Sequence, residues 1–175
     1  SVDNINSVSY QRYGFGLSSG YKGKIFSVEL ISFKAFDDAK SLNFETQNPE
    51  LTPRDNMVFS VKSSIRPLKT LSLNFEAASS LITQDILASD PDHSRRFYDG
   101  IVQGNQTTEF NQALNASIDY KIKVFGIGVK YERIDPDYNT LGAVYFNNDL
   151  ENITINPSFS LLKNKLILNV STGYQ

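Results

Sequence analysis

Apolar and polar residues alternate along much of this chain. In residues 70–78 every second side chain is apolar: Leu71, Leu73, Phe75 and Ala77. A β-strand places alternate side chains on opposite faces, whereas a helix would scatter both sets around its surface. The segment therefore predicts a strand with one apolar and one mainly polar face.

The same period recurs in eight segments bounded by turn-forming residues. They span residues 8–21, 25–36, 56–65, 70–79, 108–120, 124–133, 151–161 and 166–174. Most are close to the ~9–11 residues that a tilted strand needs to cross a bilayer, and exceed the ~5–6 residues usual in soluble sheets. The predicted lipid-facing set contains Leu71, Leu73, Phe75, Leu114, Ile118, Ile127, Val129, Leu168 and Val170. The predicted inward set contains Glu29, Lys62, Glu76, Asp119, Lys130 and Glu132, with Gly14, Gly16, Gly126 and Gly128.

Short and long connections alternate strictly between these segments. The tight turns lie near residues 22–24, 66–69, 121–123 and 162–165, and the long loops at about 37–55, 80–107 and 134–150. Outer-membrane barrels combine short periplasmic turns with long extracellular loops in this way. The chain is therefore predicted to be all-β, a single segment (1–175) of an antiparallel transmembrane β-barrel meander. Ser80 to Leu87 could form a helical turn in the second long loop.

With the tight turns in the periplasm, both ends of the chain would lie outside the cell. Complete single-chain bacterial barrels generally begin and end in the periplasm, so about eight strands are expected to belong to a larger barrel. The alternative is that the eight strands close into a narrow barrel filled by side chains and that the orientation is inverted, which would place the long loops in the periplasm.

Composition narrows the classes of protein further. The chain is 40% hydrophobic, but no window approaches the ~20 apolar residues that a membrane-spanning helix needs, which excludes a helical membrane protein. It has no cysteine, and its net charge of -2 provides no basic surface, so no nucleic-acid partner is expected. Tyrosines near four predicted strand ends are candidates for an interfacial aromatic girdle: Tyr21, Tyr120, Tyr131 and Tyr174.

The run from Tyr131 to Gly142 reads Tyr-x-Arg-Ile-x-Pro-x-Tyr-x-x-Leu-Gly. It resembles a segment of large outer-membrane β-barrel proteins of Bacteroidota, in which a strand ends and enters an extracellular loop. Phe36-Asp37-Asp38 and Glu76-Ala77-Ala78-Ser79 are similar to strand ends in the same proteins. The resemblance implies a barrel in the outer membrane, and some such barrels serve the secretion and gliding machinery of that phylum. It implies no catalytic residue.

The long loops contain the candidate contact residues. They are acidic, basic or aromatic side chains: Asp92, Arg95, Arg96, Tyr98, Asp135, Asp137 and Tyr138. Loop anchoring and solvated turns are the more ordinary roles for such residues. His93 is the only histidine, and no Gly-x-Ser-x-Gly elbow accompanies it. We therefore expect no enzyme activity, no catalytic residue, no cofactor and no metal site.

Two functions remain open. The first is an outer-membrane barrel component, either a transport conduit or a part of a secretion or gliding assembly. Its partners would be outer-membrane lipid and other outer-membrane or periplasmic proteins. The alternative is a soluble all-β module that binds carbohydrate or protein. A transmembrane barrel needs detergent to stay in solution, whereas a soluble module does not.

Overall fold

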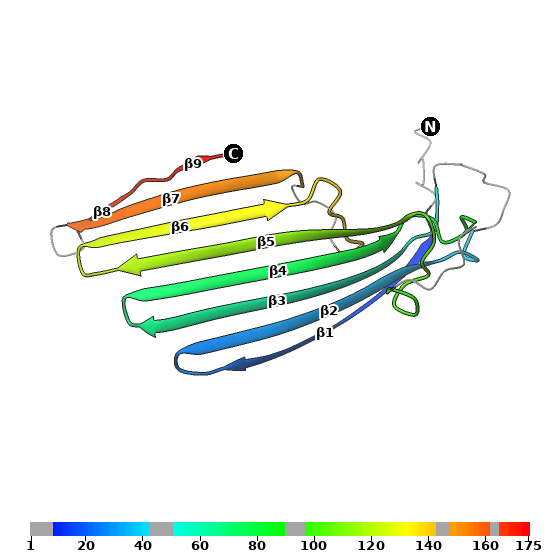
Figure 1. The fold of residues 1–175 in the computed structure, drawn as a ribbon, viewed down its shortest axis with the longest axis horizontal. Coiled ribbons are helices and arrows are strands. Elements are labelled where there is room, and N and C mark those ends of the chain that lie inside the picture. The colour runs from blue at the N-terminus through cyan, green and yellow to red at the C-terminus, as the bar shows by residue number, and fades with distance from the viewer. Residues whose placement is uncertain (1–8, 43–50, 90–96, 143–147, 162–164) are drawn as a thin grey trace, which may run out of the picture.

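A computed structural model describes residues 9–42, 51–89, 97–142, 148–161 and 165–175. These residues form one antiparallel sheet of nine strands in which neighbours in sequence are neighbours in space (Figure 1). The strands are β1 (Gln11–Lys22), β2 (Phe26–Asp38), β3 (Asp55–Leu68), β4 (Leu71–Thr83), β5 (Thr108–Lys121), β6 (Phe125–Ile134), β7 (Leu150–Leu161), β8 (Leu166–Asn169) and β9 (Thr172–Tyr174).

The predicted strands are confirmed, with shifts of a few residues at their ends. The largest shift is in β4, which continues to Thr83 where the sequence suggested a helical turn from Ser80. Ser80 to Thr83 pair instead with Thr108 to Asn111 of β5, so the second long loop begins at Gln84. Val8 and residues 162–164, parts of the first predicted strand and the last predicted turn, lie outside the described residues.

β8 and β9 are two halves of the one strand predicted at 166–174. Both pair with β7 in the same register, with Ser158 opposite Asn169 and Ile155 opposite Thr172. Pro157 lies opposite the interruption. Its carbonyl accepts a hydrogen bond from the Val170 amide (3.0 Å), but proline has no N–H to donate in return. The interruption is therefore a missing ladder hydrogen bond in an otherwise continuous pairing.

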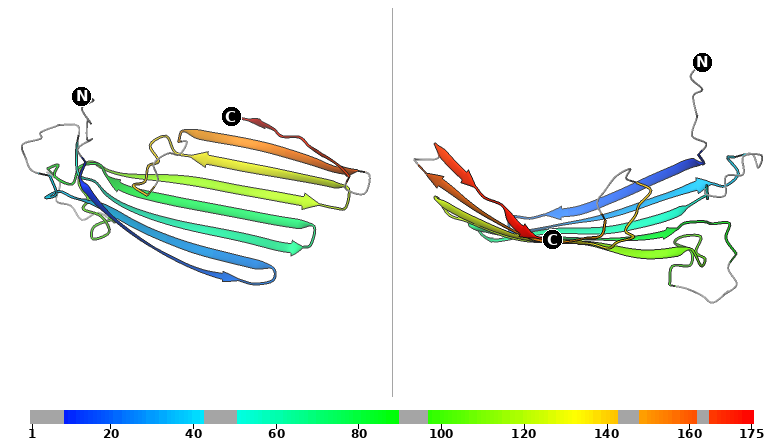
Figure 2. Two further views of the ribbon diagram at one scale, coloured as in Figure 1. Left: turned by 180° about the vertical axis from the view of Figure 1, so that it is seen from behind. Right: turned by 90° about the horizontal axis from the view of Figure 1, so that it is seen from above.

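The sheet is curved, and its first and last strands do not meet (Figure 2). In each strand every second side chain points to the same face, and residues opposite each other in a ladder share a face. The register therefore shows which half of the residues of each strand lies on the convex face. Its largest exposed side chains are apolar: Phe15, Leu17, Tyr21, Leu30, Phe59, Phe75, Ile118, Val129, Ile153 and Leu168.

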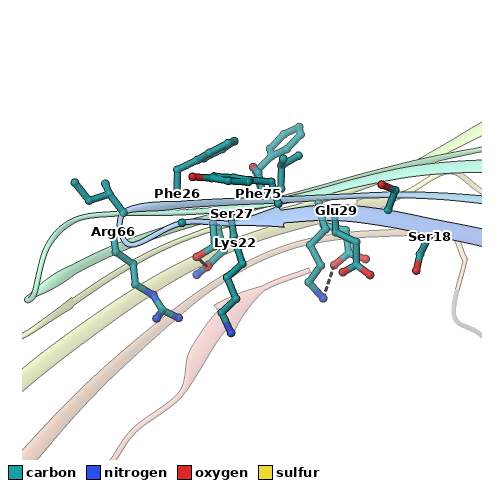
Figure 3. Close-up of a pocket in the computed structure, with 18 of the residues that line it drawn as sticks. Ser18, Lys22, Phe26, Ser27, Glu29, Arg66 and Phe75 are labelled. Atoms are coloured by element: carbon teal, nitrogen blue, oxygen red, sulfur yellow. Dashed lines mark hydrogen bonds and ion pairs between the residues drawn. The ribbon is translucent and has the colours of Figure 1, made fainter.

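The remaining, alternate side chains of each strand lie on the concave face, and most of them are polar. The two faces are visible in Figure 3, where Phe26 and Phe75 project to one side of the sheet and Lys22 and Glu29 to the other. The predicted division is confirmed: eight of the nine residues expected to face lipid share the convex face, and the six expected inward charges share the concave face. Val170 falls in the interruption between β8 and β9.

The turn ends of the strands are staggered (Figure 1). One ladder row joins Tyr21 of β1 to Tyr174 of β9 through every intervening strand. β1 ends one residue beyond this row, at Lys22, whereas β8 begins eight residues before Tyr174. From β1 to β8 the turn end therefore shifts along the strand direction by seven residues, over seven spacings between neighbouring strands. This is one residue, ~3.3 Å, for each ~4.8 Å spacing. If all the turns lay at one level, as in a barrel, the strands would be tilted by about 35° from the barrel axis.

Buried side chains gather at the loop end of the sheet. Ala35 and Ile82 are buried on the concave face, and Leu81 and Asp55 on the convex face. Long loops cover the sheet there, whereas the remainder of the strands forms a single layer.

Candidate functional site

A row of charged and amide side chains crosses the concave face between its two ends. Consecutive ladder partners in this row are Glu29, Lys62, Glu76, Asn115 and Glu132. The Lys62 ammonium lies 3.6 Å from the Glu76 carboxylate (Figure 3). Both side chains of this pair are exposed, so the ion pair adds little stability. Charged side chains that are neither buried nor fully paired indicate that this face is in contact with water.

The next row towards the tight turns is a hydrogen-bonded chain. The Ser64 hydroxyl donates to the Asn74 side-chain oxygen (2.8 Å), and the Asn74 amide donates to the Ser117 hydroxyl (3.1 Å). Asn74 and Ser117 both also donate to the Asp119 carboxylate, at 3.3 and 3.2 Å. This network joins the side chains of β3, β4 and β5 and orders the middle of the concave surface.

Residues 135–142, here called the strap, follow β6 and lie across the concave face at its loop end (Figure 2). The strap begins on β5. The Gln112 amide donates to the Asp135 carboxylate (2.8 Å), and the Asn111 side chain donates to the Asp137 carbonyl (3.0 Å). It then passes over β4, where the Ser80 hydroxyl donates to the Asn139 carbonyl.

Asn56 of β3 holds the middle of the strap. Its side chain is wholly buried, and all its polar capacity is used. The side-chain oxygen accepts hydrogen bonds from the Thr140 hydroxyl (3.1 Å) and the Leu141 amide (3.0 Å). The side-chain amide donates to the Ser80 hydroxyl (2.9 Å) and the Leu81 carbonyl (3.0 Å). One side chain therefore ties the strap to β3 and β4 at once.

The C-terminal end of the strap packs against Phe33 of β2. A Cβ added to Gly142 would lie 2.7 Å from the Phe33 ring, so the ring and the strap backbone are in direct contact. Gly14 and Gly16 of β1 lie beside the same ring, and a Cβ at either position would be in ordinary van der Waals contact with it, 3.4 Å away. The strap thus spans from β5 to β2.

Tyr138 lies within the strap and is mostly buried. Burial, and to a smaller extent the negative charge of Glu76, raise the pKa of its phenol above 10. A raised folded-state pKa means that the neutral phenol stabilises the folded state below the unfolded pKa of ~10, and that this stabilisation is lost as the pH rises through the folded value.

We therefore expect the strap to be unaffected by pH near neutrality and to loosen only under strongly alkaline conditions. An alkaline absorbance titration of the wild type should contain a late-ionising phenol that is missing in Tyr138→Phe. A difference curve centred at the pKa of an ordinary tyrosine would contradict this arrangement.

A second loop covers the convex face at the same end of the sheet. Lys34 of β2 and Asp55 of β3 form an ion pair of 2.5 Å whose side chains are 17% and 4% exposed. The Lys34 ammonium also donates to the Ile101 carbonyl (2.7 Å), and the Gln103 amide donates to the Asp55 carboxylate (2.8 Å). This outer clamp, defined by Lys34 and Asp55, fixes the loop between β4 and β5 to the sheet.

The candidate residues expected from sequence do not form one site. Asp135, Asp137 and Tyr138 belong to the strap on the concave side, where Asp135 and Asp137 serve as hydrogen-bonding anchors. Tyr98 belongs to the loop over the convex side, and its half-exposed ring lies against Gly104. Asp92, Arg95 and Arg96 lie outside the described residues.

The structural centres of the site, Asn56 and the Lys34–Asp55 pair, were not anticipated. Lys34 and Asp55 interrupt the alternation of their strands, because they lie on the otherwise apolar face, and that interruption was a signal available in the sequence. Asn56 keeps the alternation, since it lies on the mainly polar concave face, and its burial beneath the strap has no local signal in the sequence.

Neither metal ligation nor helical membrane anchoring has support in the described part of the chain. No three His, Cys, Asp or Glu side chains gather there in a way that could hold a metal ion. No helix in those residues is long and apolar enough to span a membrane. Comparison with known proteins finds no matching family model, curated protein or solved structure.

Proposed function

We propose that this chain forms part of the wall of a transmembrane β-barrel in a bacterial outer membrane, with water on its concave side. The observation that carries the proposal is the convex face: a broad apolar surface, uncovered over most of its length, on a sheet one layer thick. Leu17, for example, is 73% exposed. Soluble proteins rarely leave contiguous apolar patches larger than a few hundred Å² in contact with water, whereas lipid is the natural contact for such a surface.

The distribution of charge supports a bilayer-sized band. In the described strands, charged residues on the convex face occur only at its loop end, where they are Lys34, Asp38, Asp55, Arg133 and Glu151. In β3 the five convex-face side chains between Met57 and Ile65 are all uncharged. At the inferred tilt, the eight residue steps from Met57 to Ile65 correspond to a height of about 22 Å, near the ~25 Å apolar band of outer-membrane barrels.

Aromatic residues border this band at both ends. At the turn end of the convex face they are Tyr21, Phe26, Tyr120, Phe125 and Phe159, and at the loop end Tyr13, Phe36, Phe110, Tyr131 and Tyr174. Two pairs are in ring contact across strands, Phe125–Phe159 at 5.3 Å and Tyr13–Phe36 at 5.6 Å. Two aromatic girdles at the water–lipid boundaries are a property of outer-membrane barrels.

The wall must continue beyond both edges of this sheet. Among the described strands, β1 pairs only with β2, and β8 and β9 pair only with β7. An unpaired edge within a bilayer leaves backbone N–H and C=O groups unsatisfied at several kcal/mol each. The proposal therefore includes further strands along both edges. The resemblance of the Tyr131–Gly142 segment to large Bacteroidota barrels supports the same location.

Membrane fractionation of the full-length protein in its native bacterium tests the proposal. We expect the protein in the outer-membrane fraction after an alkaline carbonate wash, soluble only in detergent, and with an electrophoretic mobility that changes on boiling. A protein that remains monodisperse in buffer without detergent would instead support the soluble binding module.

A further inference from the structure

Resting on the proposed barrel, we infer that the strap sets the largest solute that can pass along the concave side of this wall. The strap lies on the face that contacts water and runs over β5, β4, β3 and β2. A segment that crosses several strands on the inside of a barrel occupies part of its cross-section. It therefore narrows the aqueous path at the loop end of the wall.

The strap is attached by specific bonds and is not merely collapsed against the sheet. Its hydrogen bonds come from Asn111 and Gln112 of β5, Ser80 of β4 and Asn56 of β3. The Asn56 side chain is wholly buried, so losing its two strap hydrogen bonds would leave buried polar groups unsatisfied. An attachment of this kind fixes the position of the strap, as a constant size limit requires.

The surface below the strap fits small hydrophilic solutes. Towards the tight turns the concave face presents the Glu29–Lys62–Glu76 row and the Ser64–Asn74–Ser117 chain. Acids, bases, amides and hydroxyls in one surface replace the hydrogen bonds of a hydrated polar solute without selecting one sign of charge. We therefore assign the path to uncharged or weakly charged hydrophilic molecules such as small sugars.

The role of Asn56 is that of a positioning residue, and two variants release the strap from opposite sides. Asn56→Ala removes the attachment from the wall. Gly142→Leu leaves the wall intact but inserts a side chain where the Phe33 ring already lies. Gln84→Ala is the matched control, because it removes an amide that donates to Glu109 (3.3 Å) at the same end of the sheet, and Gln84 belongs neither to the strap nor to the surface assigned to the solute.

The experiment uses the full-length protein in liposomes, with swelling rates measured for a monosaccharide, a disaccharide and a trisaccharide. Boiling-sensitive mobility on gels confirms that each variant is folded. We expect Asn56→Ala and Gly142→Leu to raise the trisaccharide rate severalfold relative to the monosaccharide rate, and Gln84→Ala to leave that ratio unchanged.

Strap release is measured separately from permeation. These 175 residues contain no cysteine, so Leu141→Cys introduces the only thiol among them. Its labelling by a membrane-impermeant maleimide, measured as the excess over the protein without this substitution, should be faster when Asn56→Ala is also present. Faster labelling with an unchanged size limit would overturn the inference, as would a membrane-inserted protein that passes none of the three sugars. Either result would leave the proposed barrel standing, whereas a protein that fails to enter membranes would refute the barrel itself.

Discussion

Val61→Arg should abolish most of the membrane-assembled protein, whereas Ser60→Arg should be tolerated. Val61 is the middle one of the five uncharged side chains that β3 presents on the convex face between Met57 and Ile65. Placing arginine at the midplane of a lipid-facing barrel surface costs ~2–4 kcal/mol. Ser60 is its neighbour in sequence but projects to the concave face, between Ile31 and Ala78. There the guanidinium can reach water.

The pair of variants tests the face assignment because both carry the same added charge in the same strand. The amount of folded protein in the outer membrane is measured by the fraction that shows boiling-sensitive mobility. Equal amounts for the two variants would mean that the convex face does not contact lipid. Greater loss for Ser60→Arg would mean that the two faces have been exchanged.

Asp55→Ala should release the loop between β4 and β5 and destabilise the protein by about 3 kcal/mol, the lower end of the range for breaking a buried ion pair. The substitution leaves the Lys34 ammonium without its carboxylate in a mostly buried position, and leaves the Gln103 amide without its acceptor. Cleavage by protease added to intact cells, within residues 97–107, should increase. Denaturant titration in detergent gives the change in stability.

A double variant separates loss of the charge pair from loss of packing. Lys34→Met combined with Asp55→Ala removes both charges, so no unpaired ion remains in the clamp. We expect the double variant to be more stable than Asp55→Ala alone, since removing both partners of a buried pair often costs less than removing one. A double variant as unstable as the sum of the two single changes would indicate that the clamp acts through shape and not through charge.

The strands and faces of this sheet could be predicted from the sequence because both depend on a local period of two. Leu73 and Asn74 carry the information needed to place each on its own side, whatever surrounds them. The tight turns were equally local. Closure was not predictable in this way, because it depends on what pairs with the outer edges of the sheet, and the local period of β1 and β8 carries no information about that pairing.

The site was predictable only in part for a related reason. Asp135, Asp137 and Tyr138 were identified as loop residues, but the sequence does not say on which side of a sheet a loop will lie. That choice is made by Asn56, whose partners Thr140 and Leu141 are more than 80 residues away. In the sequence Asn56 resembles the other polar residues of the concave face, so nothing local distinguishes it as the position where the strap docks.

The strict alternation of short and long connections also governs the order in which this sheet can form. A three-residue turn (23–25) joins β1 and β2, whereas 24 residues (84–107) separate β4 from β5. By the logarithmic dependence of closure entropy on loop length, the longer connection costs about 2 kcal/mol more to close. Hairpins β1–β2, β3–β4, β5–β6 and β7–β8 can therefore form early as separate units. Pairing of the hairpins across the long loops is then the slow step. Until it is complete, the unpaired edge strands of each hairpin are free to pair with a non-native strand.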